Sequence, residues 1–284
     1  MFEQALINGL VLSSVYVLMA LGFTMIFGIM KIVNFAHGEF YMLGAFALYF
    51  TYQVYEMNFI LAIIVSAVLI GMFGMFLEKV LFRKLGNDEM KVMILALGVS
   101  IFLQNLGIVL FGATTKAISP PFQGMLDLGF VSISYYNMFI IIISVIVLIA
   151  FYFFIKKMKT GQAFIAVSHD EEIASVQGIN VKRIKMIAFG IGILLAAFAG
   201  ALVTPLYTVS PTIGMGALMN AFIVVILGGL GSIMGALWGG IIIGLSRSYL
   251  TTYIGAAEAD LLIFILIAAL LLVKPNGLLG GSYQ

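Results

Sequence analysis

Apolar residues form long continuous runs along this chain, and short polar segments separate them. A helix needs about 20 mostly apolar residues to cross the hydrocarbon core of a bilayer. Strands of a membrane barrel would instead alternate apolar and polar residues over ~10 positions, so the continuous runs favour helices. We expect membrane helices at about residues 5–30, 38–55, 58–77, 92–112, 137–155, 184–206, 213–230, 235–254 and 259–273.

Several of these runs are shorter than a full span. The prediction is therefore an all-α, polytopic membrane protein with eight or nine membrane helices, of which one or more is broken or re-entrant. Residues 1–284 are expected to form a single transmembrane domain. The run from Ala5 to Met30 exceeds the apolar region of a secretory signal, so we expect it to remain as a spanning helix.

Composition agrees with this pattern. The chain is 63% hydrophobic and 9% charged, whereas soluble domains are about 45–50% apolar and about 25% charged. The bilayer is therefore the expected solvent. A net charge of +2 is too small to indicate a nucleic-acid partner. The absence of cysteine from the sequence excludes disulfides, thiolate metal sites and cysteine nucleophiles.

Basic residues predict the orientation, because short cytoplasmic loops of membrane proteins are enriched in lysine and arginine. Two segments hold ten of the fourteen basic residues: Lys79, Arg83, Lys84 and Lys91 in one, and Lys156, Lys157, Lys159, Lys182, Arg183 and Lys185 in the other. Both are expected in the cytoplasm, so that residues 156–185 form a cytoplasmic loop and residues 113–136 an external one. Counting spans places the C-terminus inside, and the N-terminus outside if 5–30 and 38–55 both cross.

The predicted cytoplasmic loop has the features of a short amphipathic helix. Apolar residues recur at roughly helical spacing at Ile165, Ala166, Ile173, Val176 and Ile179. Ser168 or Asp170 is suited to cap its start, and Glu171 and Glu172 would lie in the first turn, where the helix dipole favours acids. Gly178 would end it as a C-terminal glycine. Such a helix docks on a partner or lies on lipid headgroups.

The segment "EEIASVQGI" (171–179) resembles the cytoplasmic loop of ABC-importer permeases, in which Glu-Ala-Ala is followed by three residues and glycine. The matching positions are Glu172, Ala174 and Gly178, while Ile173 replaces the first alanine. Further stretches are similar to the LivH-type permeases of branched-chain amino acid importers. They are "ALINGLVLSSVYVLMALGFTMIFG" (5–28), "FGIMKIVNFAHGEFYMLGAF" (27–46), "VILGGLGSIMGALWGGIIIG" (225–244) and "LLVKPNGLLG" (271–280).

This resemblance implies a permease subunit of an ATP-driven importer for leucine, isoleucine and valine, working by alternating access in the bacterial inner membrane. It implies a homologous second permease, two cytoplasmic ATPase subunits and an extracytoplasmic substrate-binding protein as partners. The helix with Glu172, Ala174 and Gly178 would sit in a cleft of the ATPase. No Walker-type loop occurs in the sequence, so ATP would be used by the partners, and we expect this chain to be no enzyme and to bind no cofactor.

Other functions remain open at this stage. A permease of the same family could import urea, amides or another small solute. An ion-driven secondary transporter would need a carboxylate inside a span, for which Glu39 is the candidate. A membrane subunit with only a structural role is the third alternative.

Strongly polar residues interrupt the apolar pattern close to the first predicted span. Asn34, His37 and Glu39 are candidates for a substrate path or gate, and Gly38 would permit a helix break there. The alternatives are a structural hydrogen-bond network or a short cytoplasmic loop. A metal site is not expected, because His37 and Glu39 are only two residues apart and His169 is the only other histidine in the sequence.

Glycines and one arginine mark the C-terminal third. Gly228, Gly229 and Gly231 suit a break between two spans, and Gly235 a close helix contact; the alternative is that the whole glycine run serves tight helix packing only. Arg247 lies inside an apolar run. We expect it to pair with Glu258 or Asp260, or to extend to the outer interface, in a structural role.

Overall fold

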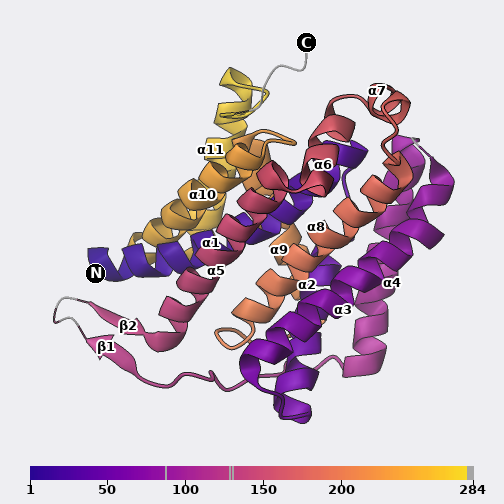
Figure 1. Ribbon diagram of the computed structural model, residues 1–284. Coiled ribbons are helices and arrows are strands. Elements are labelled where there is room, and N and C mark those ends of the chain that lie inside the picture. Colours follow the sequence, from indigo (N-terminus) through magenta and orange to yellow (C-terminus); the bar gives the residue numbers. More distant parts are fainter. Residues whose placement is uncertain (87, 128, 130, 280–284) are drawn as a thin grey trace.

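The computed structural model describes residues 1–86, 88–127, 129 and 131–279. Over these residues the chain forms long helices joined by short connections, with one small hairpin (Figure 1). The helices are α1 (Phe2–Met30), α2 (His37–Leu48), η1 (Tyr49–Val54), α3 (Phe59–Val80), η2 (Phe82–Leu85), α4 (Glu89–Phe111), α5 (Tyr135–Lys157), α6 (Lys159–His169), α7 (Glu171–Val176), α8 (Val181–Val203), α9 (Ile213–Gly228), α10 (Ile233–Tyr253) and α11 (Ala256–Val273). The strands are β1 (Met125–Asp127) and β2 (Ser132–Ser134).

The predicted helical membrane fold is confirmed in its main feature. Seven helices in the described part of the chain are long and apolar enough to cross a membrane: α1, α3 together with η2, α4, α5, α8, α10 and α11. The expected spans at 38–55 and 213–230 correspond to shorter helices. The first is α2 continued by the π-helical η1, and the second is α9. A total of eight or nine spans therefore remains a prediction.

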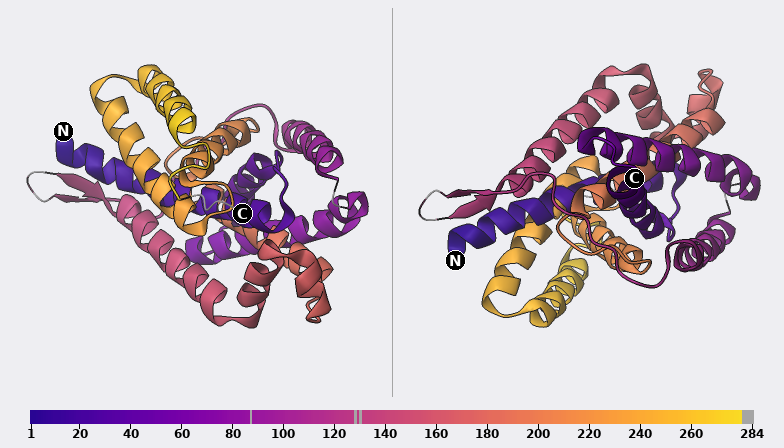
Figure 2. Two further views of the ribbon diagram at one scale, coloured as in Figure 1. Left: turned by 90° about the horizontal axis from the view of Figure 1, so that it is seen from above. Right: turned by 90° about the horizontal axis from the view of Figure 1, so that it is seen from below.

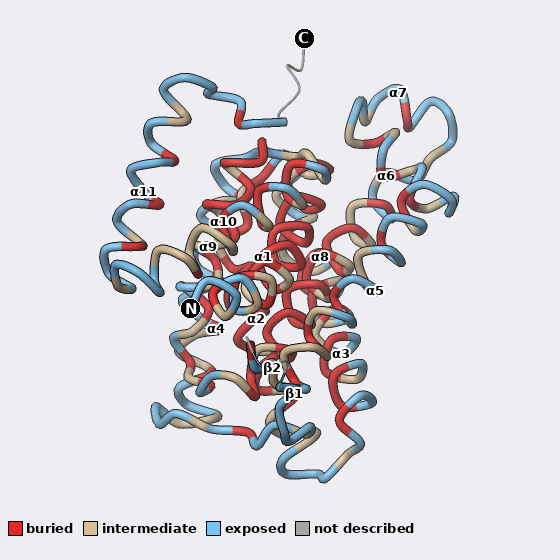
Figure 3. The backbone as a smooth tube through the Cα atoms, turned by 90° about the vertical axis from the view of Figure 1, so that its left-hand side faces the viewer, coloured by how far each residue is buried: buried red, intermediate tan, exposed pale blue. Residues whose placement is uncertain are grey.

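Helix α1 occupies the centre of the molecule, and nearly all of its residues from Val15 onward are buried (Figure 3). It packs most extensively against α10 and α8. Glycines of α10 permit this approach, because Gly240 lies against Val17 and Gly244 against Ser13, where any side chain would collide with α1. In lipid, such small residues let helices associate through close van der Waals packing.

The peripheral helices α4, α5 and α11 present apolar side chains outward. Val109 of α4, Ile146 of α5 and Leu266 of α11 are all at least half exposed. An apolar outer surface of this extent requires lipid or another apolar protein surface. The fold is therefore that of a multi-pass membrane protein.

The two ends of the helix bundle differ, because one has a β-hairpin and the other has short helices (Figure 1). The hairpin end holds β1 and β2, which pair antiparallel with Met125 opposite Ser134. There the main chains of Lys116 and Val209 also exchange two hydrogen bonds of 2.8 and 2.7 Å. The opposite end, named here the α7 end, holds α6, α7, η2 and the last turn of α1. Viewed along the bundle, α10 and α11 lie on one side of the molecule and α3 and α4 on the other (Figure 2).

Candidate functional site

Helix α7 is a short, well-capped helix at the α7 end. The side chain of Asp170 accepts a hydrogen bond of 2.9 Å from the Ile173 amide at its start. At its end, the amide of Ile179 donates to the carbonyl of Ala174 and that of Gly178 to Ser175, which is the Schellman arrangement. Gly178 has a φ of 83°, a left-handed conformation that favours glycine.

The expectation of one amphipathic helix through Ile165 and Val176 is wrong, because Asp170 adopts an extended conformation and divides the segment into α6 and α7. Ser168 does not cap α7, since its hydroxyl donates within α6 to the carbonyl of Ile165. Helix α6 packs on its neighbours through the buried Gly161, Phe164 and Val167. Of these two helices, α6 is thus packed on the bundle, whereas α7 is mostly exposed.

The outward face of α7 is apolar. Val176 is 88% exposed and Ile173 is 59% exposed, although both are large aliphatic side chains. Ala174 points inward and is buried, while Glu172 and Gly178 are exposed. Exposed aliphatic side chains on a charged helix indicate a surface that contacts another molecule.

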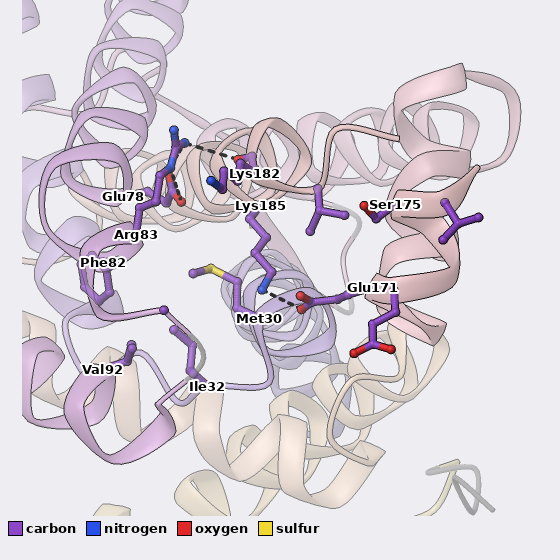
Figure 4. Close-up of a pocket in the computed structure, with 14 residues that line it drawn as sticks. Met30, Ile32, Glu78, Phe82, Arg83, Val92, Glu171, Ser175, Lys182 and Lys185 are labelled. Atoms are coloured by element: carbon purple, nitrogen blue, oxygen red, sulfur yellow. Dashed lines mark hydrogen bonds and ion pairs between the residues drawn. The ribbon is translucent and has the colours of Figure 1, made fainter. Parts of the chain in front are cut away.

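A cavity of about 530 Å³ lies beside α7 (Figure 4). Apolar side chains from the end of α1 and from η2 and α4 line one side, including Met30, Ile32 and Phe82. Acidic and basic side chains from α7 and α8 line the other, including Glu171 and Lys185. The cavity is open between these two walls and forms a cup at the α7 end.

One ion pair and one hydrogen bond tie the walls of this cup to α8. The Lys185 ammonium lies 2.6 Å from the carboxylate of Glu171, and both side chains are partly buried. Arg83 pairs with the buried Glu78 at 2.7 Å and also donates to the main-chain carbonyl of Lys182 at 3.3 Å. Both α7 and η2 are thus bonded to the first turn of α8. Helix α8 in turn packs along α1, α2 and α3, so α7 is connected through α8 to the centre of the bundle.

The polar stretch after α1 lies inside the bundle. Helix α1 ends at Lys31, which has a φ of 56°, and the following connection is folded back with Ile32, Asn34 and Ala36 buried. The Asn34 side chain closes this connection by accepting a 3.1 Å bond from the Ala36 amide. Most of residues 32–39 are therefore buried against other helices.

His37 shows how deep this connection reaches. Its Nε2 atom lies 3.2 Å from the carbonyl oxygen of Met19, and its ring packs edge-on against Phe23. Met19 lies eleven residues before the end of α1 at Met30, which at 1.5 Å per residue is about 16 Å along the helix. That is about half the thickness of a bilayer core. Helix α2 therefore begins deep in the bundle, as in proteins with discontinuous membrane helices.

The candidate residues of this break contact different helices. Glu39 is buried and accepts a 3.1 Å bond from Ser100 of α4, whereas its second carboxylate oxygen has no partner. Gly38 lies directly against Gly214, so α2 and α9 begin side by side. The break therefore contains Asn34, His37 and Glu39, but their side chains do not converge on one point. None of the three lines the cup or the second cavity, which is described below.

The glycine segment between α9 and α10 forms a sharp reversal. Helix α9 ends at Gly228, and Gly229 and Gly231 have φ angles of 104° and 82°. Gly235 of α10 lies directly against Gly228 of α9. The C-terminal segment completes this region, because the amides of Leu278 and Leu279 donate to the carbonyls of Leu227 and Gly228. Gly280, the last residue of the "LLVKPNGLLG" stretch, lies outside the described residues.

A second cavity, of about 760 Å³, opens at the hairpin end, and sequence reasoning did not identify it. Arg247 of α10 lines it and pairs with Asp260 of α11 at 2.7 Å, one of the two partners expected. Its guanidinium also donates to the Tyr16 hydroxyl at 3.0 Å and to the Asn220 side chain. A lone arginine in an apolar run was the only signal for this site. No cluster suited to a metal ion occurs among the described residues.

Comparison with known proteins gives matches over nearly the whole chain. The family model for the permease component of branched-chain amino acid transport systems matches residues 5–273. The high-affinity branched-chain amino acid transport system permease protein LivH of Escherichia coli (strain K12) is 35% identical, over 98% of this chain and 96% of the relative. Protein BraD of Pseudomonas aeruginosa, of the same description, is 34% identical over the same shares.

A partial match extends to a sugar permease. The ribose import permease protein RbsC of Haemophilus influenzae is 34% identical over 36% of this chain and 34% of its own length. No solved structure matches the chain. Because the family model and the two longer relatives span almost all of the sequence, this chain belongs to the family of permease components of branched-chain amino acid transport systems.

Proposed function

We propose that this chain is the membrane-spanning permease subunit of an ATP-driven importer for leucine, isoleucine and valine. The observation that carries the proposal is the capped helix α7 with its exposed Ile173 and Val176, at the α7 end of a chain that belongs to a permease family. A capped helix with exposed apolar side chains offers a docking surface to a separate subunit. A secondary transporter or a purely structural subunit has no need of it.

The orientation follows from the basic residues. Lys182, Arg83 and Lys185 gather at the α7 end, around the cup. The positive-inside rule assigns this end to the cytoplasm and the hairpin end to the outer side. The N-terminus is then outside and Lys274 inside, with α2–η1 and α9 each completing a crossing. The membrane is the bacterial inner membrane.

Coupling to ATP hydrolysis runs through α7. Glu172, Ile173 and Val176 enter a cleft of a cytoplasmic ATPase subunit, and Gly178 sets the direction in which the chain leaves. Ala174 anchors α7 to this chain because its side chain is buried. When the ATPases close on ATP, α7 moves, and the ion pair between Glu171 and Lys185 carries that movement into α8. Alternating access of the bundle follows.

The complete importer contains further subunits. A homologous second permease covers part of the apolar outer surface, two ATPases dock at the α7 end, and an extracytoplasmic binding protein delivers the amino acid at the hairpin end. The break at Asn34, His37 and Glu39 acts as a gate inside the bundle, because α2 begins there at about half depth. The Gly228–Gly235 reversal lets α9 and α10 move as one packed pair.

Uptake of labelled leucine into vesicles that contain the reconstituted complex and its binding protein tests the proposal. We expect accumulation that requires ATP and persists when proton and sodium gradients are collapsed. Uptake driven by a gradient alone would indicate a secondary transporter, and absence of any leucine uptake would remove the assigned role. Urea, acetamide and ribose serve as competitors, since the partial likeness to a ribose permease makes other solutes the second candidate.

A further inference from the structure

The cavity at the hairpin end has the size and depth of a substrate site. Its volume of about 760 Å³ lies within the ~300–1,000 Å³ range of small-molecule pockets. Helices α1, α5, α8, α9 and α10 contribute to its lining. It extends inward to Met19, whose carbonyl accepts the bond from His37 at the start of α2. The cavity therefore runs from the hairpin end to Met19, the residue that bonds to His37 of the proposed gate.

Among the residues that the structure describes, Arg247 is the only one with a charged side chain lining this cavity. It lies two turns inside the end of α10 and joins four helices, through Tyr16 of α1, Asn220 of α9 and Asp260 of α11. A charge within a membrane span is costly, about 2.5–3.5 kcal/mol at a helix centre on insertion scales. Charged residues in spans face the bundle interior or a water-filled cavity, and they mark substrate or ion pathways.

The guanidinium keeps hydrogen-bonding capacity. Its Nη1 atom donates hydrogen bonds to Tyr16 and Asn220, and its Nη2 atom pairs with the carboxylate of Asp260. Because a guanidinium has five N–H donors, Nε and one Nη2 hydrogen remain for another acceptor. A carboxylate suits this position, since arginine binds planar carboxylates through two parallel hydrogen bonds. The side chain is also 25% exposed, so a ligand in the cavity can reach it.

The rest of the lining suits an aliphatic amino acid. Val11, Leu12 and Val15 of α1 form an apolar wall. On α5, Asn137 lines the same cavity, and its side-chain oxygen is buried without a partner. An unpaired buried acceptor is unfavourable unless something donates to it, and an ammonium group has three donors.

From these contacts we infer that the hairpin-end cavity is a binding site for an aliphatic α-amino acid, with Arg247 as the receptor of its carboxylate and Asn137 as an acceptor for its ammonium group. The inference rests on the proposed function and names the place in this chain where the substrate first binds. Asp260 then has a supporting role, because it holds the guanidinium at the edge of the cavity.

Equilibrium dialysis of labelled L-leucine against the purified chain in lipid nanodiscs, without the binding protein, tests this site. We expect leucine to bind the unmodified chain and unlabelled leucine to displace it. Leucinamide, which lacks the carboxylate, should compete at least tenfold less well. Arg247→Gln should weaken leucine binding at least tenfold. The control Asn105→Ala removes a polar side chain that bonds only within α4, outside the cavity, and should leave leucine binding unchanged.

A comparison of two variants separates ligand binding from mere support of the fold. If the Arg247–Asp260 pair were only structural, Asp260→Asn would harm leucine binding as much as Arg247→Gln. If Arg247 binds the leucine carboxylate, the Asp260→Asn variant should still bind leucine. The double variant Arg247→Gln/Asp260→Asn should not bind leucine, although it buries no unpaired charge. Equal loss in both single variants, leucine binding in the double variant, equal competition by leucinamide or no binding to the unmodified chain would each overturn the site. ATP-driven uptake by the complex would in those cases leave the permease role intact.

Discussion

His37 donates a hydrogen bond from Nε2 to the carbonyl oxygen of Met19, 3.2 Å away, although α1 continues for about three more turns beyond Met19. The chain therefore leaves α1 at one end of the bundle and returns half-way through it before α2 begins. Residues 31–36, which connect α1 to α2, thus form an internal joint between these helices.

His37→Ala should impair transport without releasing the ATPases. The change removes the bond to Met19 and the edge-on contact with Phe23, and leaves a cavity at the joint. We expect a loss of about 1–3 kcal/mol of stability, and a fall in leucine uptake because the joint between α1 and α2 loses its fixed geometry. Leucine uptake measures transport, and co-purification of the ATPases measures assembly. His169→Ala, at the exposed end of α6, is the matched control.

Unchanged uptake in His37→Ala would show that the joint has only a structural role.

Gly178→Ala should uncouple ATP hydrolysis from transport. The structure leaves open space around a side chain at this position, so the effect comes from the left-handed backbone, which costs about 1–2 kcal/mol for a residue with Cβ. We expect the assembled complex to hydrolyse ATP while leucine uptake falls, measured as the ratio of the two rates.

Gly86→Ala is a control for a positive-φ glycine outside α7, because Gly86 has a φ of 65° and open space around it at the same end of the molecule, where it lines the cup. Coupling should survive there, since Gly86 lies outside α7. Equal effects of the two substitutions would argue against a special role for α7, and Gly178→Asn should be the milder replacement because asparagine tolerates this conformation.

The ion pair between Glu171 and Lys185 should transmit movement from α7 to α8. Glu171→Lys and Lys185→Glu should each lower the number of leucine molecules imported per ATP, because like charges then face each other across the cup. The double exchange should recover part of that loss, with an interaction of about 0.5–3 kcal/mol in a double-mutant cycle. Additive losses in the cycle would mean that the two side chains act separately.

Gly235→Ala should destabilise the α9–α10 pair, because a side chain there would meet the backbone of Gly228. We expect a loss of about 1–3 kcal/mol, typical of overpacking, and a lower melting temperature in detergent. Gly98→Ala in α4 has no atom within 4 Å of the new side chain. That variant should be neutral or slightly stabilising, by about 0.5–1 kcal/mol, since alanine favours a helix over glycine. A melting temperature for Gly235→Ala equal to that of Gly98→Ala would contradict close packing at the reversal.

Helix α7 was largely predictable because its determinants are local. Asp170 and Gly178 lie within a turn of the helix they delimit, so their residue types indicate the cap and the left-handed end directly. The separation of α6 from α7 was not, because the apolar spacing from Ile165 to Val176 is compatible with one continuous helix. Packing of Phe164 against the bundle, and the extended backbone at Asp170, decided between the two.

The cavity around Arg247 was beyond sequence reasoning for a different reason. Its pairing with Asp260 was one of two expected contacts, since both residues flank one short turn. The bonds to Tyr16 and Asn220 join residues up to 231 positions apart, and no local pattern indicates them. The sequence therefore predicted that Arg247 is an unfavourable charge in a membrane span and that Asp260 is one of its two candidate partners. It did not predict the cavity that Arg247 lines.

By itself, the sequence determined that this chain is a membrane protein, which residues form most of its helices, and how α7 is capped. These features depend on hydrophobicity, the length of apolar runs and capping residues, all of which act over neighbouring residues in the sequence. Only the tertiary structure decided that α2 begins beside Met19, that Gly38 meets Gly214, and that four helices meet at Arg247. Those relationships depend on how close distant helices approach, and glycine contacts and buried hydrogen bonds set that distance only once the whole bundle is assembled.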